Sequence, residues 1–166
     1  MVPAQNFKRK MKIKLSSKQL RFIILGFCIL WMAVIFGFSA SYATDSSNQS
    51  GSLVNLITNM VGGNISLDGK IALEVAVRKA AHIIEFCILG ALWYGFFYLS
   101  PSGRFKPTTA AFLVSLIYAV SDEVHQYFVP GRAARLYDVG FDTLGIVLGI
   151  LAVIFILRRY KIWKQK

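Results

Sequence analysis

Two histidines in this chain each lie one helical turn from a carboxylate. His82 precedes Glu85 by three residues, and Asp122 precedes His125 by three. Residues three or four positions apart share one face of a helix, so each pair would present an imidazole beside a carboxylate. A histidine oriented by a carboxylate is a common nucleophile or general acid–base. These four residues are therefore candidate catalytic groups.

Further polar residues accompany the two pairs. Asp138 and Asp142 are spaced i, i+4 at the start of the last apolar stretch, where either carboxylate could hold water or a second proton. We include Asp142 among the candidate catalytic groups. Guanidinium groups bind phosphate through two parallel hydrogen bonds. The arginines near the pairs are therefore candidate phosphate ligands: Arg78, Arg132 and Arg135.

Apolar segments must position these groups. Four stretches are apolar enough to cross a bilayer, at roughly 21–40, 80–99, 108–128 and 139–157. Hydrophobic residues make up 55% of the 166-residue chain, which is too high for a soluble domain. Segments of about 20 apolar residues match the hydrocarbon core, where unsatisfied peptide groups force a helical backbone. The sequence predicts an all-α, four-transmembrane-helix bundle.

The charges orient this bundle. Most of the 19 basic residues lie in 1–21, 100–107 and 158–166, which contain no Asp or Glu. Short loops rich in Lys and Arg stay cytoplasmic. We therefore expect a multi-pass protein of the plasma membrane with both termini cytoplasmic and with 41–79 and 129–138 outside. The basic residues suit anionic lipid headgroups, and nucleic acid is not an expected partner.

Two further segments carry weaker signals. Residues 1–40 have the basic start and apolar run of a signal peptide, but the run is long and an uncleaved anchor is favoured. Residues 42–52 are polar and are expected to be flexible, whereas 53–61 repeat apolar residues at helical spacing. We expect 53–61 to form a short extracellular amphipathic helix or a loop that packs on the bundle.

Three sequence blocks resemble one known family. RKAAHIIEFCILG (78–90), SDEVHQYFVPGR (121–132) and DVGFDTLG (138–145) are similar, in this order, to the signature blocks of the VanZ-like membrane protein family. The end of the first span, FGFS (36–39), also fits. The resemblance covers roughly residues 20–155. It implies a VanZ-like transmembrane domain over 21–157, with a basic cytoplasmic N-terminus (1–20) and tail (158–166).

The resemblance also implies functional positions and a cellular role. The family's polar residues fall on Arg78, Lys79, His82, Glu85, Asp122, Glu123, His125, Gln126, Arg132, Asp138 and Asp142. The family's founding member is associated with resistance to teicoplanin-type antibiotics. An outward-facing site that acts on a lipid-linked or phosphorylated cell-envelope substrate is the main expectation.

Three alternatives remain open from the sequence. The polar residues could form a salt-bridge network that only holds the helices together. His82-x-x-Glu85 and Asp122-x-x-His125 could bind a metal ion such as zinc, manganese or iron. The pocket could also bind a membrane lipid or wall precursor without changing it. Transport would require more helices than one chain supplies, and an oligomer is compatible with the pattern.

Overall fold

The computed structural model describes residues 16–40, 43–61, 65–100, 105–130 and 137–164. Within these ranges the chain forms five helices and no strand, which confirms the all-α prediction. The helices are α1 (Ser17–Ser39), α2 (Ala43–Val61), α3 (Leu67–Tyr98), α4 (Pro107–Tyr127) and α5 (Asp138–Lys164).

Local sequence signals explain where three of the helices begin. At α1, the Ser16 hydroxyl accepts from the backbone N–H of Gln19 at 3.2 Å, and the Gln19 side chain accepts from the Ser16 N–H at 2.9 Å. This reciprocal pair is a capping box. Ser66 caps α3 by accepting from the Gly69 N–H. Pro107 opens α4, where its missing N–H costs no intrahelical hydrogen bond.

Three of the helices are long and apolar enough to cross a membrane: Ser17–Ser39, Leu67–Tyr98 and the Asp138–Ile162 part of α5. The sequence predicted a fourth span at 108–128. The corresponding helix α4 has 21 residues, but Pro-Thr-Thr at its start and Asp-Glu-Val-His-Gln at its end lower its mean hydropathy. By length and composition alone, three spans are supported.

The helix bounds differ from the expected ones at three places. The helix α2 begins at Ala43, so it includes the polar residues that were expected to be flexible. The helix α3 begins at Leu67, well before residue 80, because Ser66 provides a cap there. The helix α5 continues past 157 to Lys164. Apolar length marks only the part of a helix that suits lipid, whereas backbone hydrogen bonding continues through polar sequence.

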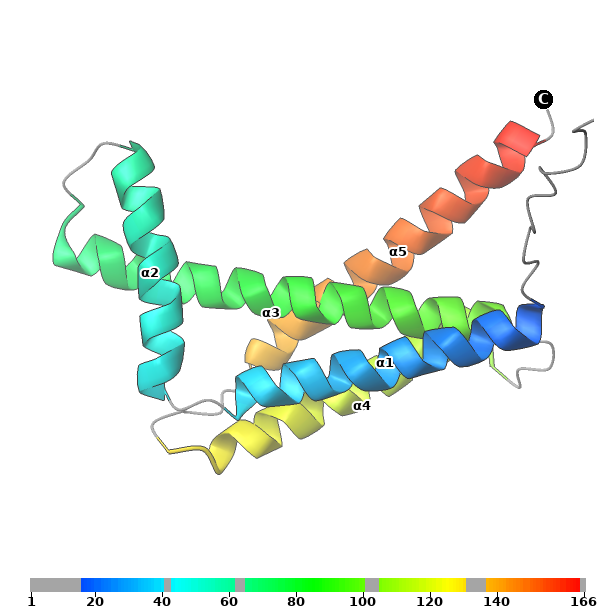
Figure 1. Cartoon of the computed structure of the whole chain (residues 1–166), viewed down its shortest axis with the longest axis horizontal. Helices are drawn as coiled ribbons and strands as arrows, with labels where there is room; N and C mark the ends of the chain where they lie inside the picture. The colour runs from blue at the N-terminus through cyan, green and yellow to red at the C-terminus, as the bar shows by residue number, and fades with distance from the viewer. Residues whose placement is uncertain (1–15, 41–42, 62–64, 101–104, 131–136, 165–166) are drawn as a thin grey trace, which may run out of the picture.

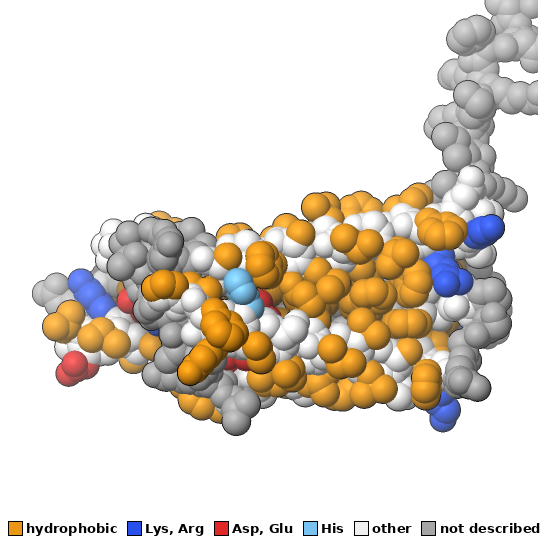
Figure 2. Space-filling view, turned by 90° about the horizontal axis from the view of Figure 1, so that it is seen from below, with side chains coloured by type: hydrophobic (Ala, Val, Ile, Leu, Met, Phe, Trp, Pro, Cys, Tyr) orange, Lys and Arg blue, Asp and Glu red, His pale blue; other side chains and the backbone are white. Residues whose placement is uncertain are grey.

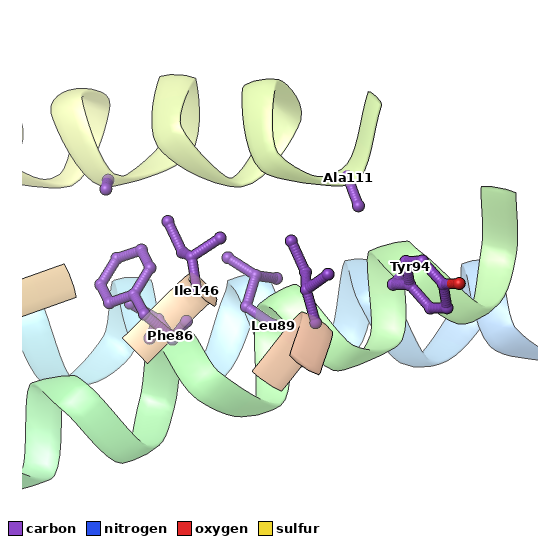
Figure 3. Packing of buried hydrophobic residues seen from close by; sticks show 8 residues of the cluster. Phe86, Leu89, Tyr94, Ala111 and Ile146 are labelled. Carbon is purple, nitrogen blue, oxygen red and sulfur yellow. The ribbon is translucent and has the colours of Figure 1, made fainter. Parts of the chain in front are cut away.

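The helices α1, α3 and α4 run side by side, and α5 crosses α3 obliquely (Figure 1). The helix α2 lies crosswise near the start of α3. The core lies between α3, α4 and α5, where Phe86, Leu89 and Ile146 are completely buried (Figure 3). Apolar side chains also cover the middle of the surface in view, while basic side chains lie at both ends and acidic side chains lie toward one of them (Figure 2). The bundle is thus apolar both inside and outside.

Glycines bring α3 and α5 into backbone contact. A Cβ atom on Gly90 would lie 2.7 Å from the carbonyl oxygen of Ile146. A Cβ atom on Gly145 would overlap the carbonyl oxygen of Ile83, and one on Gly149 would overlap that of Cys87. Small residues allow helices to approach closely in membranes, where packing drives association. Gly145 and Gly149 are spaced i, i+4 and form such a pair on α5, and Gly90 adds a third contact from α3.

The first prediction concerns this crossing. Gly149→Ala should destabilise the protein by about 1–3 kcal/mol, because the added methyl group has no space beside the Cys87 carbonyl. Gly140→Ala is the matched control, since Gly140 lies on the same helix and a Cβ atom added there would have nothing within 4 Å. Thermal unfolding in detergent measures both. An unchanged midpoint for Gly149→Ala would contradict the close crossing.

Candidate functional site

His82 and Asp142 meet between α3 and α5. The His82 Nδ1 atom lies 3.3 Å from Oδ1 of Asp142, whose carboxylate is completely buried. The imidazole is only partly buried. Sequence spacing suggested Glu85 as the carboxylate that orients His82, but the carboxylate at hydrogen-bonding distance comes from another helix. The His82–Asp142 pair, which we call the dyad, therefore depends on the close crossing of α3 and α5. This crossing lies one to two helical turns further along the helices.

The charges of two more carboxylates reach the same imidazole. Glu85 on α3 and Asp122 on α4 both lie close enough to His82 to act on its ring electrostatically. Asp122 and Asp138 act on Asp142 in the same way. The structure therefore brings polar residues of α3, α4 and α5 into one cluster, which we call the polar site.

Asp122 is held by a buried hydrogen-bond network. Its Oδ2 atom accepts from the Ser39 hydroxyl at 2.8 Å and from the Gln126 amide at 2.8 Å. The Gln126 amide also lies 3.3 Å from the Ser39 oxygen. All three side chains are buried. Because Ser39 ends α1, this network attaches the first helix to the polar site.

Ser39 was not a candidate in the sequence analysis. It appeared there only as the last residue of the FGFS match. A usable signal did exist, because Ser39 is a hydroxyl at the end of an apolar span, at the same end of the bundle as the acidic residues. Polar side chains at such depth usually face the bundle interior and pair with one another.

Three buried polar atoms of the site lack a hydrogen-bond partner among the described residues. They are Oδ1 of Asp122, Oδ2 of Asp142 and Nε2 of His125. Buried polar atoms in folded proteins are nearly always paired, and each exception calls for an explanation. Each carboxylate thus has one oxygen held by the protein and one oxygen without a partner among the described residues.

His125 has an aromatic neighbour from α1. Its ring stacks on Phe36, with centroids 4.3 Å apart and an angle of 28° between the planes. The sequence predicted that Asp122 would orient His125, but the donors that hold Asp122 are Ser39 and Gln126. Ring stacking is therefore the contact that positions His125 within the described part of the chain.

Lys79 and Asp138 form an ion pair between α3 and the start of α5. Their Nζ and Oδ1 atoms are 2.7 Å apart, and both side chains are partly exposed. The ammonium also lies 4.4 Å from the ring centroid of Tyr137 and 4.1 Å from that of Phe141. Cation–π contacts of this kind add to the ion pair. Lys79 thus helps to fix the first turn of α5 against α3.

The remaining candidate residues are placed as follows. Arg78 and Glu85 are partly buried on α3. The backbone carbonyl of Glu85 accepts a hydrogen bond of 2.9 Å from the Trp31 indole of α1. Glu123 on α4 is buried and only 6% exposed. Arg132 and Arg135 lie outside the described residues.

The site lies within a region that identifies the family. The family model described as VanZ/LLP1 matches residues 23–158. The chain belongs to the VanZ/LLP1 family. This match confirms the resemblance seen in the three sequence blocks and includes every residue of the polar site. No curated protein and no solved structure matched the chain.

The metal hypothesis finds no support in the described part of this VanZ/LLP1 family member. No group of three or more His, Cys, Asp or Glu residues there is arranged to hold a metal ion. The two histidines have other neighbours, since His82 contacts Asp142 and His125 stacks on Phe36. The His-x-x-Glu and Asp-x-x-His spacings therefore do not assemble the ligand set that they suggested.

The second prediction concerns the Asp122 network. Ser39→Ala should lower stability by about 1 kcal/mol, because one of the two donors to Oδ2 of Asp122 is lost in a buried place. Ser121→Ala is the control, since the Ser121 hydroxyl is exposed and bonds only the Tyr118 carbonyl. Thermal unfolding in detergent compares the variants. Equal midpoints for the two would show that Ser39 does not hold Asp122.

Proposed function

We propose that this protein is a membrane enzyme that carries out acid–base chemistry on a lipid-linked or phosphorylated molecule of the cell envelope. One observation carries the proposal: a partly exposed imidazole, His82, contacts a completely buried carboxylate, Asp142. A buried carboxylate fixes the orientation of an imidazole and stabilises its protonated form, as general acid–base catalysis requires. His125, Asp122 and Glu85 would assist from the same site.

The arrangement of the site supports catalysis over a purely structural role. A network that only joined helices would use its polar atoms on one another. Here one oxygen of Asp122, one oxygen of Asp142 and Nε2 of His125 have no partner among the described residues. Figure 2 shows that a histidine side chain reaches the surface of the bundle. The His82 side chain itself is 23% exposed, so a reacting group can approach its ring without unfolding of the bundle.

The direction of the helices supports four membrane crossings. Gly145 contacts Ile83, and Gly149 contacts Cys87, so the residue numbers of α3 and α5 rise together along the crossing. The two helices therefore run in the same chain direction, although they cross obliquely. Because α4 connects them, it has to return the chain to the side from which α3 began. We infer that α4 is the fourth span despite its polar ends, which lie near the two membrane surfaces.

The charge distribution supports an outward-facing site. Lys18 and Arg21 lie at the start of α1, and Arg158, Arg159 and Lys161 lie near the end of α5. The polar site lies at the opposite ends of these helices. Cytoplasmic placement of the basic ends would put the polar site at the outer leaflet of the plasma membrane. There it would meet envelope lipids and lipid-linked precursors, which links the proposal to teicoplanin-type resistance.

The third prediction tests catalysis. His82→Gln and Asp142→Asn should each lower the rate at which the envelope lipid is converted, on the order of 100-fold. The double variant should lose no more, because the effects of substituting residues that act as a unit are not additive. The measurement is mass spectrometry of envelope lipids from cells that express each variant at matched membrane levels. Asp68→Asn, an exposed carboxylate at the start of α3, is the control.

Two results of that experiment would reject catalysis. The wild-type lipid pattern in the double variant would show that the dyad is not required. Identical lipid species in cells with and without the wild-type protein would leave only binding as the function.

The fourth prediction tests the orientation. A cysteine introduced at Ser46 should react with a membrane-impermeant maleimide in intact cells, whereas one at Lys166 should react only after lysis. The wild-type protein gives the background, because Cys28 is completely buried and Cys87 lies within α3. Labelling of the Lys166→Cys protein in intact cells would show that the topology is the reverse of the proposed one.

A further inference from the structure

The end of the bundle opposite the polar site carries basic residues and no acidic ones. It comprises the start of α1, the end of α3, the start of α4 and the end of α5 (Figure 1). None of the eight Asp and Glu residues lies within α1, after Glu85 in α3, before Asp122 in α4 or after Asp142 in α5. The basic side chains at this end therefore have no Asp or Glu partner among the described residues. Positive charge that the protein does not balance itself favours an anionic partner.

One of these cations, Arg21, is held against an aromatic cluster from another helix. Its Cζ atom lies 4.8 Å from the ring centroid of Phe96 on α3. Phe96 packs edge to face on Trp93 and on Phe97, with ring centroids 5.6 Å and 5.2 Å apart. Trp93 and Phe97 also stack on each other at 5.7 Å. These three rings of α3 form one aromatic cluster, and the Arg21 guanidinium lies over it.

The packing of α1 on α3 places Arg21 at this position. A Cβ atom added to Gly95 would lie 3.8 Å from Cδ1 of Ile24, which follows Arg21 by nearly one turn of α1. The two helices are therefore close together beside the cation. Arg21 is partly buried, whereas Lys18 in the preceding turn is exposed. Residues three positions apart are neighbours on a helix surface, so the Lys18 ammonium is able to reach the same region.

Stacking leaves the hydrogen-bonding edge of the guanidinium free for a ligand. A cation–π contact uses the flat face of the group, whereas its five N–H donors point outward in the plane. No Asp or Glu of the described residues lies at this end of the bundle to accept from them. Two parallel N–H groups of arginine match two oxygens of a phosphate, which the single ammonium of lysine does not. The edge of Arg21 is therefore suited to bind a phosphate.

The surface beside Arg21 suits the acyl chains of a lipid. Phe22, Phe27 and Ile29, which follow Arg21 on α1, are each more than half exposed. Aromatic side chains, Trp above all, gather where the hydrocarbon core of a membrane meets the headgroups. A ligand that joins a phosphate to apolar chains matches both the cation and this apolar surface. A soluble phosphate or a nucleic acid would match the cation alone.

We propose that Arg21, assisted by Lys18 and supported by the aromatic cluster, binds the phosphate of an anionic phospholipid. The lipid belongs to the leaflet at the basic end of the bundle, which is the cytoplasmic leaflet in the proposed topology. This binding site does not depend on the proposed enzyme, because the polar site lies at the other ends of the helices. A lipid bound there would strengthen the attachment of α1 to the end of α3.

Native mass spectrometry of the full-length protein in detergent tests the proposal. The protein is titrated with dioleoyl phosphatidylglycerol, which is anionic, or with dioleoyl phosphatidylcholine, which has the same chains and a phosphate but no net charge. The first phosphatidylglycerol molecule should bind at least about fivefold more tightly than phosphatidylcholine, since each basic residue near an anionic headgroup contributes on the order of that factor. Equal binding of the two lipids would overturn the proposal.

Two arginines provide a matched comparison. Arg159 near the end of α5 also lies over an aromatic ring, with its Cζ atom 5.1 Å from the centroid of Phe155, but this ring belongs to the same helix. Arg21→Gln and Arg159→Gln therefore remove the same charge from the same end of the bundle. Arg21→Gln should weaken phosphatidylglycerol binding about tenfold, because hydrogen bonds between charged groups are lost. Arg159→Gln should bind within about twofold of the wild type.

Two outcomes of this comparison would overturn the site. Equal losses in the two variants would show only a general attraction to the basic end, and no loss in Arg21→Gln would show that its guanidinium does not hold the lipid. Thermal unfolding without added lipid verifies that each variant is folded.

Two further measurements address the aromatic cluster and the source of the phosphate. Phe96→Leu keeps an apolar side chain but removes the ring under Arg21, so it should weaken phosphatidylglycerol binding several-fold. Unchanged binding would contradict the supporting role of the cluster. Glycerol phosphate in excess should not displace the lipid, because it has no acyl chains. Displacement would identify a soluble anion as the ligand and overturn the proposal.

Discussion

The backbone contact between α3 and α5 is the constraint on which the rest of the structure depends. Glycines at three positions let the two backbones touch where the helices cross. Only at this distance can a short aspartate side chain on α5 reach an imidazole on α3. The same contact sets the parallel direction of the two helices, and this direction requires α4 to run back between their ends. The close crossing of α3 and α5 thus determines both the His82–Asp142 contact and the direction in which α4 runs.

The polar site is also where the four long helices are joined. Ser39 attaches α1 to Asp122, Trp31 bonds the Glu85 carbonyl, and Lys79 fixes the start of α5. Buried charge is seldom the most stabilising filling for such a place, because apolar residues of similar size often do as well. The polar site lies where four helices meet and contains acceptor atoms without partners among the described residues, which fits the proposed chemistry better than a purely stabilising role. Apolar packing around Phe86 and Leu89 supplies the stability separately.

Sequence patterns predicted the parts of this structure that depend on local or periodic features. Apolar length located the three helices that are long and apolar enough to cross a membrane. Pairings between helices were harder, because helical periodicity relates residues only within one helix. It therefore predicted that Glu85 orients His82, whereas the carboxylate within hydrogen-bonding distance of His82 is that of Asp142. Ser39 and the start of α2 were missed for a similar reason, since neither carries an apolar pattern of its own.

The length of α3 has a mechanical consequence. Its 32 residues span about 48 Å, which exceeds the hydrocarbon thickness of about 30 Å. The helix is unbroken from Leu67 to Tyr98 and makes its tightest contacts beyond His82. The first part of α3, with α2 lying against it, therefore extends well beyond the crossing with α5. A sideways displacement of that part of α3 would move His82 relative to Asp142, because the two residues lie next to the point where the two helices are held together.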